Sequence, residues 1–204
     1  MSLRTTISFA LLAGVSMFAA HTASAAKPAV PDAVIAPAAK GGESISISFD
    51  DKHVWVDAGD KHLYGESSAG TRYWRRGVGG EAVVEAKTTP DGFKLKTPAD
   101  KVAWKVKIGP DKIKIADNEE MQHPWSIKFK AGENAKVLDA KDKEVGAVKF
   151  YAESGKIKIK DAADKEAFVV ESGRRSESYG MLLIKDVPEE YRLMLMGELF
   201  LRGH

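Results

Sequence analysis

A repeated strand-turn-strand unit limits what this chain can fold into more than any other feature of its sequence. Residues 93–109 (FKLKTPADKVAWKVKIG) align with residues 157–173 (IKIKDAADKEAFVVESG), and residues 136–148 align with residues 158–170 at an offset of 22. Each unit has two short segments of alternating polar and apolar residues around a turn rich in Asp, Lys and Ala, which is typical of a β-hairpin. The repeat therefore predicts an all-β domain of successive hairpins.

The alternation also predicts which side chains are buried. In residues 102–108, apolar side chains at every second position share one face of the strand and the lysines share the other. The buried face is expected to hold Val102, Trp104, Val106 and Ile108. Outward lysines keep a sheet soluble and oppose pairing at its edges, so we interpret the lysine stripe as structural rather than as a polyanion-binding surface.

Further strand-like segments precede the clear repeats, at residues 44–49, 53–58, 61–66, 71–76 and 81–86. With the later segments, the last of them near residues 179–185, we expect an antiparallel meander of about ten to twelve short strands. A meander of this size closes into a barrel or splits into two sheets.

The C-terminal segment favours the barrel. A helix is predicted over residues 187–202, with Asp186 as its N-cap and Pro188 in its first turn. Apolar residues at 193–196 and at 199–201 cover every side of this helix, so it needs burial all round. We therefore expect the strands to close around it. The alternative is a β-sandwich with the helix packed on one sheet.

This combination resembles the tubby-like superfamily, which includes the LURP-one proteins and the phospholipid scramblases. The residues that carry the resemblance are strand-turn-strand units such as 156–170 (KIKIKDAADKEAFVV) and the terminal helix at 188–201 (PEEYRLMLMGELFL). It is a resemblance of architecture over residues 43–204. It implies a closed antiparallel barrel threaded by an apolar helix, with a noncatalytic surface that engages membrane lipid or a protein partner.

The N-terminus predicts export. Arg4 precedes an apolar run over residues 7–20, and Ala23-Ser24-Ala25 is the small-x-small pattern of a signal peptidase site, so residues 1–25 are expected to be a signal peptide cleaved after Ala25. The run is shorter than the roughly 20 residues that a membrane-spanning helix needs, which favours cleavage over a retained anchor. The mature chain is then periplasmic or secreted, and not an integral membrane protein.

Composition sets the limits of the mature domain. Residues 26–42 are rich in proline and alanine, which predicts an extended tether before a folded domain at residues 43–204. The chain has no cysteine, so disulfides cannot hold the domain together. The formal charge of +2 falls to +1 when Arg4 is removed, which argues against nucleic acid as a partner.

Two groups of residues are candidate binding sites. The first is basic and aromatic and would hold an anionic ligand: Arg72, Tyr73, Trp74, Arg75, Arg76, Arg174 and Arg175. Strand alternation points Arg72 and Trp74 away from Tyr73 and Arg75, and internal ion pairs would explain these arginines equally well.

The second group is a possible Zn²⁺ or Cu²⁺ site. If residues 53–66 form a hairpin with a two-residue loop, its cross-strand neighbours bring two imidazoles and two carboxylates to one face: His53, Asp57, His62 and Glu66. Ordinary surface His-carboxylate pairs are the alternative.

The sequence gives little support for catalysis. It has no thiol nucleophile, no nucleophile elbow, no zinc-protease helix and no glycine-rich phosphate loop. We therefore expect a noncatalytic envelope module, without a cofactor, that binds an anionic or apolar ligand, a lipid surface or another envelope protein. A periplasmic metal-binding protein is the first alternative and a hydrolase is the second.

Overall fold

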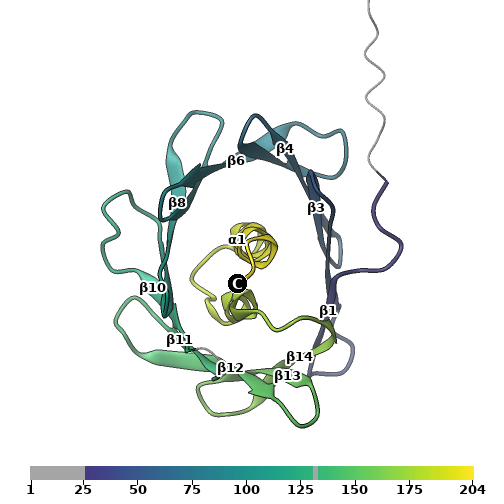
Figure 1. The fold of residues 1–204 in the computed structure, drawn as a ribbon, viewed down its shortest axis with the longest axis vertical. Coiled ribbons are helices and arrows are strands. Elements are labelled where there is room, and N and C mark those ends of the chain that lie inside the picture. Colours follow the sequence, from purple (N-terminus) through teal and green to yellow (C-terminus); the bar gives the residue numbers. More distant parts are fainter. Residues whose placement is uncertain (1–25, 131–132) are drawn as a thin grey trace, which may run out of the picture.

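The computed structural model describes residues 26–130 and 133–204, and it shows a closed antiparallel β-barrel around a C-terminal helix (Figure 1). Strands that follow one another in the chain are neighbours in the barrel, and the first strand pairs with the last. This confirms the predicted meander and its closure, and the sandwich alternative is wrong. The predicted signal peptide, residues 1–25, lies outside the described residues.

The barrel has fourteen strands rather than the expected ten to twelve. Their bounds are β1 (Ala33–Pro37), β2 (Ile45–Phe49), β3 (His53–Ala58), β4 (Lys61–Ser68), β5 (Thr71–Arg76), β6 (Ala82–Thr89), β7 (Gly92–Lys96), β8 (Val102–Ile108), β9 (Lys112–Ala116), β10 (Trp125–Lys128), β11 (Ala135–Leu138), β12 (Glu144–Tyr151), β13 (Lys156–Asp161) and β14 (Glu166–Gly173). The predicted inward face of β8 is confirmed in the middle of the strand, where Trp104 and Val106 are buried.

Strand β1 lies within residues 26–42, which were predicted to be an extended tether. Residues 33–37 pair with β14 on one side and residues 33–35 pair with β2 on the other, so they close the barrel. Ala33 and Ile35 are fully buried, whereas Val34 between them is not. The prolines suggested a chain without partners, but this short alternating stretch supplies the pairing that the edge of β14 would otherwise lack. The folded domain therefore begins before residue 43.

The repeated turns share one backbone conformation. Asp100, Asp142 and Asp164 each have φ of 59°, the left-handed region, and each donates its N–H to the carbonyl three residues earlier at 2.9–3.0 Å. A register shift follows in each hairpin where the second strand begins. Asp tolerates this conformation better than most residues, which explains why an acidic residue recurs where glycine is usual.

Two helices fill the barrel interior. The 3₁₀ helix η1 (Glu177–Leu183) occupies the segment expected to be the last strand, and α1 (Glu189–Leu201) follows it. Every residue from 178 to 184 is buried, so this segment has no outer face to show the alternation of a wall strand. Figure 1 shows α1 inside the ring of strands.

Helix α1 meets the predicted requirement for burial on all sides. Residues 193–200 are buried without exception, including Gly197, where an added Cβ would lie 3.0 Å from a methyl group of Val56 and 3.1 Å from the ring of Trp74. The predicted N-cap is wrong: the helix begins after Pro188, and Asp186 instead accepts a hydrogen bond from the indole of Trp125 at 3.2 Å.

Candidate functional site

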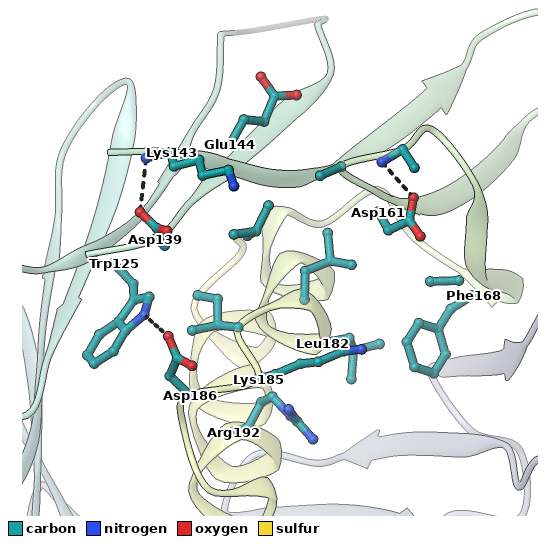
Figure 2. Close-up of a pocket in the computed structure, with 16 residues that line it drawn as sticks. Trp125, Asp139, Lys143, Glu144, Asp161, Phe168, Leu182, Lys185, Asp186 and Arg192 are labelled. Carbon is teal, nitrogen blue, oxygen red and sulfur yellow. Dashed lines mark hydrogen bonds between the residues drawn. The ribbon is translucent and has the colours of Figure 1, made fainter. Parts of the chain in front are cut away.

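A hollow of about 970 Å³ lies at the end of the barrel where η1 connects to α1 (Figure 2). We call it the barrel mouth. Five parts of the chain line it: Trp125 of β10, the β11–β12 turn with the start of β12 (Asp139, Lys143, Glu144, Val145), the β13–β14 turn with β14 (Asp161, Ala162, Ala163, Ala167, Phe168), the end of η1 with its connection (Leu182, Leu183, Ile184, Lys185, Asp186), and Arg192 of α1. Its volume is that of a small-molecule pocket.

The floor and one wall of the barrel mouth are apolar. Leu182, Leu183 and Ile184 are buried side chains that reach the hollow from the end of η1, and Phe168 faces it from β14. These residues border the hollow because the helical plug ends there while the strands continue. An alkyl or aromatic group placed here would bury apolar surface on both sides.

Of the four carboxylates at the barrel mouth, Asp186 accepts a hydrogen bond from Trp125, and two others are held within their turns by backbone hydrogen bonds. Asp139 accepts from the backbone N–H groups of Lys141 and Lys143 at 2.8 and 2.9 Å, and Asp161 accepts in the same way from Ala163 and Lys165 at 2.9 Å. The bonds from Lys143 and Lys141 hold the pKa of Asp139 below its usual value. These carboxylates are therefore parts of the turns.

The fourth carboxylate, Glu144, forms an ion pair with Lys136 at 3.1 Å. Figure 2 shows its carboxylate turned away from the hollow. The acidic groups of the barrel mouth, including Asp186 with its indole donor, thus all have partners within the protein.

The cations of the barrel mouth differ in this respect. Within residues 26–130 and 133–204, no carboxylate lies at ion-pairing distance from Lys143, Lys185 or Arg192. Arg192 is half-buried, and its Nε is fully buried without a hydrogen-bond partner in the described structure. Burial lowers the pKa of Arg192, and the charge of Glu189 opposes that shift in part. A guanidinium so placed favours an anionic partner.

The arginines predicted to bind an anion along β5 have partners within the protein. Arg72 donates from Nε to Glu198 at 2.9 Å, and the indole of Trp74 donates to the same carboxylate at 3.0 Å. Arg76 binds Glu190 through two hydrogen bonds of 2.8 Å. These residues therefore join the wall to α1.

Arg75 and Tyr73 lie on the outer face, as the alternation predicts. Arg75 donates to the carbonyl of Gly80 at 3.0 Å and lies 3.8 Å from a carboxylate oxygen of Glu66. Tyr73 is opposite Glu66 in the neighbouring strand.

Arg174 and Arg175 also have internal partners. Arg174 donates to the carbonyl of Phe200 and lies 4.5 Å from that ring, and Arg175 donates to the carbonyl of Glu133 and lies 3.9 Å from the ring of Phe150. Positions 190 and 200, where Arg76 and Arg174 contact α1, are separated by about 15 Å of helix. The structure therefore does not gather the predicted arginines into one site, and anion binding by any of them stays a prediction.

The hairpin behind the predicted metal site has the expected register. His53 is opposite Glu66, Trp55 is opposite Tyr64, and Asp57 is opposite His62. The Trp55 and Tyr64 rings, with centroids 5.7 Å apart, lie between the two His-carboxylate positions.

Each imidazole of this hairpin binds a different carboxylate. His62 Nδ1 lies 2.8 Å from Asp57, and His53 Nδ1 lies 2.9 Å from Asp50, which was not among the predicted ligands. Burial raises the pKa of Asp57, but hydrogen bonds from Lys27 and His62 outweigh it and leave that pKa below its usual value. In the part of the chain that the structure describes, no three His, Asp or Glu side chains gather closely enough to hold a metal ion.

Sequence reasoning missed the barrel mouth. One signal was present, because Arg192 directly precedes the apolar run 193–196 of a helix that must be buried. A basic residue in such a helix needs an opening or a counter-charge. The remaining lining residues come from turns whose neighbourhood is set only when the barrel closes.

Comparisons with known proteins leave the chain without an assigned family. Among the described residues, no helix has both the length and the apolar character needed to cross a membrane. The resemblance to the tubby-like superfamily stays a prediction. No protein family model, no curated protein and no solved structure matches this chain.

Proposed function

We propose that this protein is a noncatalytic binding module of the cell envelope that holds an amphipathic ligand in the mouth of its barrel. The observation that carries the proposal is the hollow of about 970 Å³, which combines an apolar floor with a half-buried arginine whose Nε has no hydrogen-bond partner among the described residues. Small-molecule sites are typically mostly apolar concavities with a few polar groups that orient the ligand.

The interior of the barrel supports this location. Side chains of α1 and η1 fill the space between the strands, so the ligand has to bind where the plug ends. Part of the wall around the barrel mouth belongs to the paired strands β10, β12, β13 and β14, whose ladder hydrogen bonds support its shape without a ligand.

The cellular location rests on the sequence. The predicted signal peptide at residues 1–25 supports an exported protein, periplasmic or secreted. A ligand in that compartment would be met either free in solution or at a membrane surface.

Two matched variants test binding in the barrel mouth. Ala163 lines the hollow at the β13–β14 turn, and Ala99 is its equivalent in the repeated β7–β8 turn. The probe is N-phenyl-1-naphthylamine, a neutral dye that fluoresces in apolar surroundings. We expect saturable binding to the native protein, a large loss with Ala163→Trp, and native binding with Ala99→Trp.

Equal binding by the two variants would place the dye elsewhere and refute the proposal, as would an absence of saturable binding to the native protein. Thermal unfolding of both variants checks that each remains folded, since both positions are exposed.

A further inference from the structure

We propose that the ligand of the barrel mouth is a single-chain amphiphile with an anionic head, which binds Arg192 while its alkyl chain lies on the floor formed by η1. This inference rests on the proposed function and adds the chemical class of the ligand. It follows from which charged side chains around the hollow already have partners within the protein. The net charge of the lining alone would not favour an anion, because the acidic side chains slightly outnumber the basic ones.

The acidic and basic side chains of the barrel mouth differ in whether they are free to bind a ligand. Asp139 and Asp161 hold turns through backbone hydrogen bonds, Asp186 binds Trp125, and Glu144 pairs with Lys136. Each of these carboxylates has one oxygen engaged with a partner inside the protein. The described part of the chain provides no such partner for Lys143, Lys185 or Arg192, so an incoming anion has three donors available.

Arg192 is the strongest of these donors. Lys143 and Lys185 are exposed and can keep their ammonium groups in water, whereas Arg192 is half-buried and its Nε is fully buried. A planar guanidinium binds a carboxylate or phosphate through two parallel hydrogen bonds, and reduced solvation strengthens those bonds.

A second hollow of about 220 Å³ adjoins Arg192, and its lining includes carboxylates that could compete with a ligand for the guanidinium. It is lined by Glu43, Lys61 and Glu189 as well as by Leu193 and Ile45. Glu189 forms an ion pair with Lys61 at 3.1 Å, and Glu43 lies against Gly59. Neither carboxylate reaches ion-pairing distance of Arg192 in the described structure.

The apolar floor selects an alkyl chain over an inorganic anion. Phe168 and Leu182 line both hollows, so the apolar surface continues on either side of the Arg192 side chain. A chain of several methylene groups would gain about 0.8 kcal/mol for each one that it buries, which inorganic phosphate cannot do.

The test compares three ten-carbon probes with different heads: decanoate, decanol and decyltrimethylammonium. Each is used below its micelle-forming concentration and competes with bound N-phenyl-1-naphthylamine. We expect decanoate to displace the dye at the lowest concentration. Inorganic phosphate and acetate, which lack the chain, should not displace it.

Arg192→Gln is the decisive variant, and Arg76→Gln is its matched control. Both arginines lie at the same end of α1, but Arg76 is bound to Glu190. We expect Arg192→Gln to weaken decanoate binding by roughly 10- to 100-fold, the usual loss for a charged hydrogen bond, and to leave dye and decanol binding unchanged. Arg192→Lys keeps the charge and should lose less. Arg76→Gln should bind decanoate as the native protein does.

The possible failures are distinguishable. Native dye binding with equal affinity for the three probes would overturn the anionic class and leave the proposed function standing. A decanoate preference that survives Arg192→Gln would overturn the role of Arg192. Binding to phosphatidylglycerol vesicles without binding to monomeric decanoate would overturn the single-chain ligand in favour of a membrane surface.

Discussion

Replacement of Glu198 by Gln tests the buried charge network that holds α1 inside the barrel. Glu198 is fully buried, and it accepts hydrogen bonds from Arg72 at 2.9 Å, from Trp74 at 3.0 Å and from Arg202 at 3.3 Å. The amide keeps the shape of the side chain but removes the only negative charge facing the two guanidiniums within the described network.

Removal of one partner from a buried ion pair costs about 3–5 kcal/mol. The side chains of Arg72 and Arg202 keep 13% and 25% exposure, so water screens part of the unpaired charge and a loss of about 3 kcal/mol is expected. With a urea m-value of about 2 kcal/mol/M, the unfolding midpoint should fall by about 1.5 M.

Glu190→Gln is the matched control for this experiment. It removes a carboxylate of the same helix from an arginine of the same strand, but Arg76 is 70% exposed. Water replaces the lost partner there, so the change should be much smaller. Similar losses in the two variants would refute the argument that burial makes the Glu198 network essential.

Four further predictions follow from the fold. Gly197→Ala should destabilise the protein by about 1–3 kcal/mol in urea unfolding, despite the better helix propensity of alanine, because the new Cβ would lie 3.1 Å from the Trp74 ring. Asp142→Val should cost about 1–2 kcal/mol because a β-branched residue is strained at a φ of 59°, whereas Asp142→Gly should not destabilise the turn. A chain that ends before Asp186 should show no cooperative unfolding by circular dichroism, because it lacks α1. Native mass spectrometry should give the same mass with and without a chelator; a Zn²⁺ or Cu²⁺ adduct that His53→Ala removes would support the metal-binding alternative.

The parts of the fold that were predictable are those encoded within short stretches of sequence. Alternation gave the strands and their buried faces, and the two-residue loop of the 53–66 hairpin placed Asp57 opposite His62. The consecutive apolar residues of α1 required a host that surrounds them, and a closed sheet supplies it.

The errors arose where the partner is distant in sequence. Strand β1 pairs with β14, about as far apart as two strands of this chain can be, so its short stretch among prolines had no local sign of a partner. Residues 179–185 are apolar enough for a strand, but they lie inside a barrel that other strands have already closed. Local patterns identify elements, and closure decides which of them form the wall.

The candidate site was unpredictable for the same reason. Arg72 and Glu198 are 126 positions apart, so the sequence left open whether this arginine binds an anionic ligand or an internal partner, and the folded protein pairs it with a buried carboxylate. Arg192 stands alone in the sequence, outside the arginine-rich strand, yet its buried Nε has no hydrogen-bond partner in the described structure. An unpaired charge can be recognised only when every possible partner has a position.

The pairing of β1 with β14 also bears on when this protein can become folded. If the chain crosses a membrane N-terminus first, as its predicted signal peptide implies, the earliest strand to emerge must wait for one of the last before the sheet can close. Helix α1, which packs inside the barrel, emerges later still. The closed and filled barrel can therefore form only after the C-terminal segment has crossed. Neighbouring strands can pair early because they are consecutive in the chain, whereas the β1–β14 pairing and the packing of α1 join remote segments, so closure of the barrel is the step that carries the loop-closure cost.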